Sequence, residues 1–445
     1  MIPPKPASRQ GRAGWLRYMR LFRRDILSAQ PAHLYRAWMA EFRTPFFRSY
    51  LMNDPELIDL VLKDRPEDFP KSTRVTEGLA PMLGRSVFVT NAAEWARQRR
   101  IIDPAFAGGE IRQAFPAIRA AAEAMVARLS EDACEIEAVA SRAAADVIFR
   151  TLFSVPIEDR LAAEVFDGFR TYQRAQPLLN LAAFLPLPNW MPRFHRPRTR
   201  AAARAIRAAV SALVARRAEE ISAGRAPDDL ATRIMTLHDP VSGTPFSTAE
   251  MVDQVAIFFL AGHETSAAAL AWALYLLAIH PEVQGRVAAE GVCYNVSDLS
   301  GHTFTRNVVR ETLRLYPPVP MMVRETLRPE TFRGRAAPVG AQVVLSPWHL
   351  HRHERIWAAP DAFDPDRWQR AETRAQARQA YMPFSAGPRV CPGAGFAMAE
   401  LVVIVSAIVS AFELSPAGPT PVPVAHLTVR SRDGIWLRLR ARTAD

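Results

Sequence analysis

The sequence predicts a mainly α-helical fold with a small β-rich part, and three observations support this. Several long stretches carry apolar residues at helical spacing, namely residues 111–129, 139–153, 199–222, 248–279 and 396–412. The alternating, β-like runs are short by comparison, at residues 47–52, 342–346 and 426–439, the last turned at Asp433 and Gly434. Residues 251–279 contain no proline and are largely apolar all round, which indicates a long helix buried in the core.

The composition narrows the class of protein. The 445 residues carry a net charge of +11, but no basic run is interleaved with aromatic residues, so we expect no nucleic-acid partner. The three cysteines, Cys134, Cys293 and Cys391, are widely separated and cannot make a disulfide framework. Residues 1–30 resemble neither a secretory signal nor a membrane anchor. A reducing cytoplasm is therefore the expected location.

The long apolar helix is expected to begin at a capping box and to carry a polar cluster in its middle. Ser247 and Glu250 have the spacing of the box. Small residues at Ala261 and Gly262 leave room for a ligand against the helix. The polar residues that follow, 263–266, can then act on that ligand. Two alternatives remain: residues 255–279 are long enough to span a bilayer, and Glu264 fits a core carboxylate without chemistry. Charge at the centre argues against the span.

The most informative segment surrounds Cys391, which lies in a predicted turn between Gly387 and Gly393. A lone thiolate there suits a single axial ligand of a flat iron macrocycle, and the glycines permit a close approach. Arg389 can reach an acidic edge of the same ligand, and Phe384 can shield the sulfur from water. The N-terminus of a following helix would favour the thiolate. The alternative is a buried structural thiol.

The ten residues 384–393 around Cys391 resemble a known signature. Phe-x-x-Gly-x-Arg-x-Cys-x-Gly is the haem-binding loop of the cytochrome P-450 monooxygenases, and residues 384–393 match all five fixed positions. The resemblance implies the cytochrome P-450 fold, an α+β fold in which haem b (iron protoporphyrin IX) lies between the long central helix and the helix after Cys391. It also implies one haem-binding domain at residues 35–445 after a basic segment at residues 1–34, with Cys391 as the iron ligand.

The central helix resembles the family at a second motif. Ala-Gly-x-Glu-Thr at residues 261–265 is similar to the oxygen-activation motif of cytochromes P-450. The resemblance implies that Thr265 and Glu264 support protonation and cleavage of the O–O bond, and that Ala261 contacts the haem.

A third motif is structural in the family. Glu311 and Arg314 match Glu-x-x-Arg, and Arg367, within residues 363–368, matches the arginine that joins them. The resemblance implies a buried ion network that holds the haem loop.

Further contacts follow from position in the family. Trp95, Arg99 and Arg324 match residues that bind the haem propionates, although many bacterial members have histidine in place of Trp95. The substrate wall is apolar, so a fatty acid, terpenoid, steroid or aromatic compound is expected. Its predicted residues are Ile257, Leu260, Val319, Met321 and Met322.

The resemblance also implies partners. Electrons from NAD(P)H for the reaction with O2 come through an acidic ferredoxin or flavodoxin with its reductase, for which Arg97 and Arg100 are candidate contacts. Residues 184–192 are expected at the substrate entrance, with at most peripheral membrane contact. Two other functions remain open. One is a peroxide-using or rearranging haem-thiolate enzyme, which often lacks the acid and threonine pair; the other is a haem protein that binds a ligand without turnover.

Two segments need separate mention. Residues 285–305 interrupt what is usually a helical connection in the family. His349, His351 and His353 alternate, as zinc ligands on one strand would, but no convincing fourth ligand accompanies them.

Overall fold

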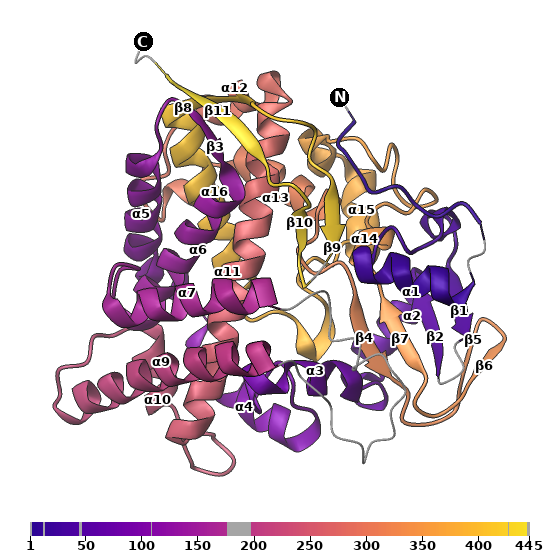
Figure 1. The fold of residues 1–445 in the computed structure, drawn as a ribbon, viewed down its shortest axis with the longest axis horizontal. Coiled ribbons are helices and arrows are strands. Elements are labelled where there is room, and N and C mark those ends of the chain that lie inside the picture. The colour runs from indigo at the N-terminus through magenta and orange to yellow at the C-terminus, as the bar shows by residue number, and fades with distance from the viewer. Residues whose placement is uncertain are drawn as a thin grey trace.

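The computed structural model describes residues 2–11, 14–43, 47–107, 109–175, 197–425 and 427–442. Helices make up most of the molecule, and the strands form small sheets beside and between them (Figure 1). The predicted helical stretches correspond to α5, α6, α9, α11 and α16. The helices are α1 (Trp15–Arg24), α2 (Pro55–Asp59), α3 (Thr73–Leu83), α4 (Ala92–Ala105), α5 (Glu110–Arg128), α6 (Ile136–Phe153), α7 (Arg160–Ala175), α9 (Pro197–Ser222), α10 (Leu230–Thr236), α11 (Thr248–Ala278), α12 (Pro281–Ala289), α13 (Thr303–Leu315), α14 (Pro347–Leu350), α15 (Ala371–Ala380) and α16 (Ala394–Ala411).

The strands form small sheets. The largest has the order β1-β2-β7-β4, with β2 and β7 parallel and the other neighbours antiparallel. A second sheet has the order β3-β11-β8, and two pairs, β9-β10 and β5-β6, complete the described strands. The strands are β1 (Met39–Arg43), β2 (Arg48–Met52), β3 (Ala133–Glu135), β4 (Met322–Glu325), β5 (Glu330–Phe332), β6 (Arg335–Ala337), β7 (Gln342–Leu345), β8 (Phe412–Pro416), β9 (Pro423–Ala425), β10 (Val429–Ser431) and β11 (Trp436–Ala441).

The predicted turn at Asp433 and Gly434 connects two sheets. Gly434 has a φ of 80°, a conformation that glycine adopts without strain. However, β10 pairs with β9, whereas β11 pairs with β3 and β8. The run at residues 426–439 is thus two strands of different sheets, because each strand finds its partner elsewhere in the chain.

Helix α11 lies at the centre of the helical part (Figure 1) and belongs to two hydrophobic clusters. Its capping box is present: the Ser247 hydroxyl accepts the Glu250 N–H, and the Glu250 carboxylate accepts the Ser247 N–H. A Cβ added to Gly262 would lie 2.3 Å from Ile148 Cδ1 of α6. Gly262 therefore lets α6 approach α11, and the expectation that it leaves room for a ligand is wrong.

Two helices among the described residues, α11 and α16, are long and apolar enough to cross a membrane. Most of each is buried against other helices, because α11 packs on α6, α9, α13 and α16, and α16 packs on α5, α12 and α13. Their apolar surface is explained by this packing, as expected for core helices.

The unusual segment at residues 285–305 is an ordered connection between α12 and α13. The Glu290 carboxylate accepts the N–H groups of Phe304 and Thr305 at 2.7 and 2.9 Å, and thus caps the start of α13. Cys293 is fully buried, and its N–H donates to Ser406 Oγ at 3.3 Å.

The N-terminal residues pack on the rest of the molecule. The Tyr316 hydroxyl donates to the Pro4 carbonyl at 2.6 Å, and Lys5 pairs with Asp361. Trp348 Nε1 donates to the Tyr35 hydroxyl at 2.8 Å. The division at residue 34 stays a prediction.

Candidate active site

The loop around Cys391 is closed by its own backbone. The Cys391 N–H donates to the Phe384 carbonyl at 2.9 Å. Gly387 has a φ of 67°, and a Cβ added there would lie 1.8 Å from the Leu62 carbonyl oxygen. Glycine is therefore required at position 387 by its conformation and by contact with another backbone segment. Gly393 immediately precedes α16, and a Cβ on it would lie 4.0 Å from Cys391 Sγ.

The surface of Cys391 is accessible to solvent, but many protein atoms lie around its sulfur. Burial raises the pKa of its thiol, while the Gly393 N–H and the charge of Arg99 act in the opposite direction. The lowering expected from the helix N-terminus is therefore present, but burial has the larger effect. Because a metal displaces the thiol proton, a thiolate is favoured here when iron binds.

One stripe of α11 is accessible although most of the helix is buried. Ala261 is exposed, and Phe258 and Thr265 are partly exposed. These residues are three or four apart and so share one face of the helix. The Thr265 hydroxyl donates to the Ala261 carbonyl at 2.5 Å.

None of the residues predicted to form the substrate wall lies on this stripe. Ile257 and Leu260 are buried in the hydrophobic cluster with α3, α4 and the helices after them. Sequence reasoning missed Phe258, although its spacing from Ala261 indicates the same face. The residues of the β4 region are partly exposed, namely Val319, Met321 and Met322.

An aromatic contact joins α11 to the cysteine loop. The rings of Phe258 and Phe106 pack edge to face, with centroids 5.8 Å apart. A Cβ on Gly393 would lie 3.9 Å from the Phe106 ring. On the buried side of α11, the Ser266 hydroxyl donates to Glu400 of α16 at 2.6 Å. The stripe and the loop are thus held in one packed unit.

Glu264 is buried beside this stripe. Its Oε2 atom accepts hydrogen bonds from the Thr428 hydroxyl at 3.0 Å and from Arg430 Nη2 at 2.8 Å. Its Oε1 atom has no hydrogen-bond partner in the part of the chain that the structure describes. The role of Glu264 in proton delivery stays a prediction.

Four cations converge near the cysteine loop: Lys71, Arg99, Arg324 and Arg389, here called the cation cluster. Burial lowers the pKa of Arg324 to about 10. Burial, together with the charges of Arg324 and Arg99, lowers that of Arg389 to about 10. The pKa of Lys71 lies well below its usual value because of burial and the three arginines. Among the described residues, the carboxylate paired with the cluster is that of Asp103, 2.6 Å from Arg99.

Trp95 lies within the cation cluster. The guanidinium of Arg389 is 4.2 Å from the centre of the Trp95 ring, and that of Arg99 is 5.9 Å away. Arg389 Nη2 also donates to Asn91 Oδ1 at 2.9 Å, and Arg99 Nη1 donates to the Val390 carbonyl at 2.8 Å. Sequence reasoning missed Lys71, because a lysine outside any motif carries no signal.

These residues fit haem b. Cys391 is an accessible sulfur, the ligand that a haem-thiolate iron requires. The α11 stripe offers the small Ala261 and the apolar Phe258 to a flat ring. The cation cluster has more positive charge than its described neighbours balance, which suits a group with two carboxylates.

The comparisons with known proteins agree with this fit. The family model described as "Cytochrome P450" matches residues 27–433. The chain belongs to the cytochrome P450 family. The predicted family, fold class and monooxygenase class are thereby confirmed. The chain is 33% identical to cyclooctat-9-en-7-ol 5-monooxygenase of Streptomyces melanosporofaciens, over 90% of this chain and 88% of that protein.

Other relatives extend the comparison. Cytochrome P450 4A11 of Homo sapiens is 31% identical, over 87% of this chain and 78% of that protein. The crystal structure of the cytochrome P450DA haem domain superposes with a TM-score of 0.81, at 22% identity, over 100% of this chain and 99% of that one. The likeness to this crystal structure shows that the chain has the same fold.

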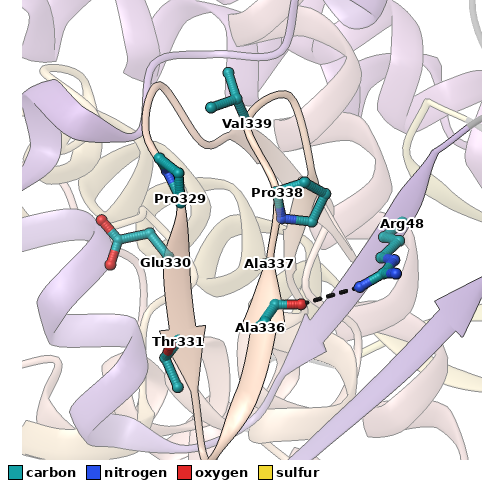
Figure 2. Close-up of a pocket in the computed structure, with 8 residues that line it drawn as sticks. All are labelled: Arg48, Pro329, Glu330, Thr331, Ala336, Ala337, Pro338 and Val339. Carbon is teal, nitrogen blue, oxygen red and sulfur yellow. Dashed lines mark hydrogen bonds between the residues drawn. The ribbon is translucent and has the colours of Figure 1, made fainter.

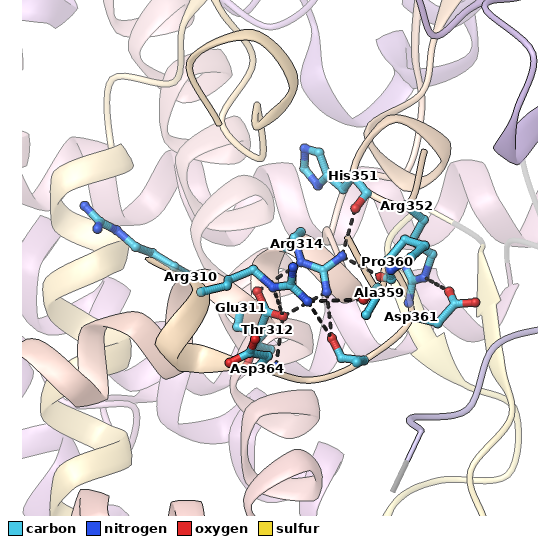
Figure 3. A network of polar contacts seen from close by, with 12 residues as sticks. Arg310, Glu311, Thr312, Arg314, His351, Arg352, Ala359, Pro360, Asp361 and Asp364 are labelled. Carbon is cyan, nitrogen blue, oxygen red and sulfur yellow. Dashed lines mark hydrogen bonds and ion pairs between the residues drawn. The ribbon is translucent and has the colours of Figure 1, made fainter. Parts of the chain in front are cut away.

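The ion network of this cytochrome P450 consists of Glu311, Arg314 and Arg367. Figure 3 shows Glu311 and Arg314, with His351, Ala359 and Pro360 beside them. Both Glu311 oxygens accept from Arg314, at 2.8 and 2.9 Å, and Oε1 also accepts from Arg367 Nε at 2.9 Å. All three side chains are fully buried. The excess guanidinium donors bond to backbone carbonyls, those of His351, Ala358, Ala359, Pro360 and Ala362.

His351 connects the ion network to the cysteine loop. Its carbonyl accepts from Arg314 at 2.9 Å, and its Nε2 accepts the Met382 N–H at 2.9 Å, two residues before Phe384. Burial lowers the pKa of His351 to about 3, so its ring stays neutral and can accept this bond. The network therefore reaches the loop through one histidine.

The histidine triplet has separate surroundings. It lies on α14 and the turn after it. His349 Nδ1 is 2.8 Å from the Ser346 hydroxyl, and His353 stacks on Trp38 with centroids 4.3 Å apart. The described ranges contain no group of three or more His, Cys, Asp or Glu suited to a metal.

Of the residues predicted to contact a redox partner or a membrane, the structure describes Arg97 and Arg100. Arg97 and Arg100 form ion pairs of 2.6 Å with Glu250 and Asp239, so their charges are already matched within the chain. Residues 184–192 lie outside the described residues.

A separate pocket of about 750 Å³ lies beside the β5-β6 pair (Figure 2). Arg48 of β2 donates to the Ala336 carbonyl at its edge, at 3.2 Å. None of its lining residues belongs to the predicted active site; they are Arg48, Pro329, Glu330, Thr331, Ala336, Ala337, Pro338 and Val339.

Proposed function

We propose that this cytochrome P450 hydroxylates a hydrophobic small molecule, using O2 and electrons from a separate redox partner. The observation that carries the proposal is the accessible Cys391 sulfur, joined through Phe106 to an accessible stripe of α11. Haem bound at this sulfur supplies the binding and activation of O2.

The residues of the stripe and its neighbour Glu264 have two roles, substrate contact and proton donation. Phe258 and Ala261 offer apolar surface that favours a hydrophobic substrate over water. Thr265 holds its hydroxyl beside the Ala261 carbonyl on the accessible stripe, where it can serve as a proton donor of the site. Glu264, the next residue, supplies that proton.

The substrate proposal draws on the relatives. One bacterial relative is named for the 5-monooxygenation of cyclooctat-9-en-7-ol, and another, 30% identical over 91% of this chain, is named cyclooctatin synthase. We include cyclooctat-9-en-7-ol among the first compounds to test, with fatty acids, steroids and aromatic compounds beside it.

The electron donor is an acidic ferredoxin or flavodoxin, reduced from NAD(P)H in the cytoplasm. The supporting observation is one exposed arginine near the cysteine loop. Arg112 is exposed next to Ile111, and a Cβ on Gly395, at the start of α16, would lie 3.4 Å from Ile111 Cδ1. A cation there can attract an acidic partner.

The assignment of Cys391 is tested by Cys391→His. The wild-type protein is expected to show the red-shifted reduced carbonyl band of a haem-thiolate, and the variant to lose it. Cys134→Ser, which changes a partly exposed thiol elsewhere, should keep the band. An unchanged band in Cys391→His contradicts the assignment.

The substrate and the type of reaction are tested with the same protein. A spin-state titration with a hydrophobic compound set identifies ligands, and product analysis with NAD(P)H and a ferredoxin system follows. Product from peroxide alone, with none from the electron-transfer system, would favour the peroxide-using alternative. Binding without product under both conditions would favour a ligand-binding haem protein.

The role of Thr265 is tested by Thr265→Ala. Removing the hydroxyl should lower the product formed per NAD(P)H by about tenfold or more and raise peroxide release, because a positioned proton donor contributes about 10²-fold or more. Thr265→Ser, which keeps the hydroxyl, should retain most of the product. Equal product yields in all three proteins contradict the role.

A further inference from the structure

Asn91 immediately precedes helix α4, but its side chain does not cap that helix. An asparagine at this position usually accepts an N–H group from the first helical turn. Here the side chain is bonded to two other segments of the chain. Its Oδ1 atom accepts the Lys71 N–H at 3.0 Å and Arg389 Nη2 at 2.9 Å, and its Nδ2 atom donates to the Lys71 carbonyl at 3.2 Å. Asn91 therefore joins two members of the cation cluster.

The backbone beside Asn91 is held from both sides. Ala92 has a φ of 49°, a left-handed conformation that residues with a Cβ seldom adopt and that persists where surrounding contacts determine it. The Thr90 carbonyl accepts Arg389 Nη1 at 3.3 Å. The Thr90 hydroxyl donates to Gln98 Oε1 of α4 at 2.6 Å. The segment that carries Asn91 is thus fixed between the cysteine loop and α4.

The contacts of Asn91 with Lys71 also bear on Arg324. The Lys71 backbone, which Asn91 binds through both its N–H and its carbonyl, forms an antiparallel bridge with Arg324. The Lys71 ammonium donates to the Phe88 carbonyl and lies 4.4 Å from the centre of the Phe88 ring. Lys71, Arg324 and Arg389 are far apart in the sequence, and Asn91 connects the segments on which they lie.

Asn91 forms these contacts without changing the charge of the cluster. Like charges that lie close together repel one another, so cations brought into one place must be held there by other bonds. Among the described residues, no carboxylate pairs with Lys71 or Arg389. A carboxylate at position 91 would hold them but would also neutralise them. The neutral amide holds both and leaves their charge available to an anion.

We propose that Asn91 is a positioning residue for the haem carboxylates: its side chain holds Lys71 and Arg389 in place before haem binds. Haem then gains these cations without the cost of ordering their side chains. The proposal rests on the proposed function, because it takes haem bound at Cys391 as the anion. Neither the cysteine motif nor the Glu-x-x-Arg motif includes Asn91.

The test compares haem b with its dimethyl ester, in which both carboxylates are uncharged. Each is loaded into the full-length protein, and its rate of transfer to excess apomyoglobin is measured. The rate for the ester divided by the rate for haem b reports the contribution of the carboxylates. In Asn91→Ala, haem b should dissociate about tenfold faster, the effect of one lost hydrogen bond to a charged group. The ester should dissociate at the wild-type rate, so the ratio falls about tenfold.

The control is Asn53→Ala, which removes a buried asparagine with a purely structural environment. Asn53 Nδ2 donates to the Leu34 and Ala37 carbonyls at 2.9 and 3.2 Å. This variant should lower the thermal stability of the protein and leave the ratio of the two rates at the wild-type value. An equal acceleration of both haems in Asn91→Ala would give Asn91 the same structural role and contradict the proposal.

Asn91→Asp provides a second variant that keeps the size of the side chain and its Oδ1 acceptor. Its carboxylate competes with haem for Lys71 and Arg389, so the ratio should again fall below that of the wild type. If Asn91→Ala does not retain haem, Asn91→Asp decides: a ratio equal to that of the wild type contradicts the proposal.

The two proposals fail differently. Absence of the reduced carbonyl band in the wild type contradicts the proposed function. A normal carbonyl band in the wild type, with the same ratio of rates in wild type, Asn91→Ala and Asn53→Ala, contradicts the role of Asn91 alone.

Discussion

The ion network and the cation cluster are both rich in arginine, but the surroundings of the guanidinium groups differ. In the network, Glu311 binds Arg314 and Arg367, and backbone carbonyls take the remaining donors. In the cluster, Arg324 and Arg389 lie near other cations, and their pKa values are lowered to about 10.

The difference separates charges that serve folding from charges that serve binding. A buried charge with full hydrogen bonding is tolerated because its partners replace water. A buried cation without a counter-charge destabilises the fold, so it persists where an anion gains from it. For a haem protein, that anion is the pair of propionates.

The comparison is tested most strongly by Glu311→Ala. The variant leaves Arg314 and Arg367 buried without their carboxylate, which should lower the free energy of unfolding by about 3 to 5 kcal/mol and reduce haem content. Urea denaturation and the haem-to-protein ratio measure both effects. As a control, Glu354→Ala removes an exposed partner of Arg36 and should cost less than about 1 kcal/mol. Equal losses in the two variants would contradict the comparison.

Arg324→Met, in contrast, should not lower the free energy of unfolding of the haem-free protein. Replacing a buried, unbalanced cation with an apolar side chain should leave the free energy of unfolding unchanged or raise it by about 1 to 3 kcal/mol. The loaded variant should release haem faster, because a propionate loses its partner. A marked loss of stability in the haem-free variant would place Arg324 with the folding charges.

Glu400→Gln extends the comparison to an acid without a cation. Burial raises the pKa of Glu400 from 4.5 to about 8, so the folded chain holds this proton more tightly than the unfolded chain. The stability it contributes is complete below about pH 4.5 and is lost as the pH rises to about 8. The variant should remove a slope of up to about 1.4 kcal/mol per pH unit. Unfolding curves at several pH values measure it; an unchanged slope would contradict the assignment.

Much of the fold follows from local signals in the sequence. The apolar periodicity gives α11 and α16, and Ser247 with Glu250 marks the start of α11. The cysteine motif likewise lies on a closed loop. These features depend on residues a few positions apart, so a single sequence contains what they need.

The remaining features depend on residues far apart in the chain. Arg430 meets Glu264 across 166 residues, and the contact between Gly387 and Leu62 joins the cysteine loop to the helical segment Leu60–Asp64. Lys71 joins the cation cluster because of where β4 lies, which no local pattern encodes. Ile257 and Phe258 are adjacent, and the packing of α11 buries Ile257 while Phe258 stays partly accessible.

The contacts of Pro4 and Lys5 bear on the order of assembly during translation. Tyr316 follows Pro4 by 312 residues, and Asp361 follows Lys5 by 356. Residues 4 and 5 therefore leave the ribosome long before their docking surface exists, and loop closure over such a distance is slow. Docking of this segment reports that the polypeptide has been made at least as far as Asp361, so a probe at residue 5 should change its signal late in synthesis.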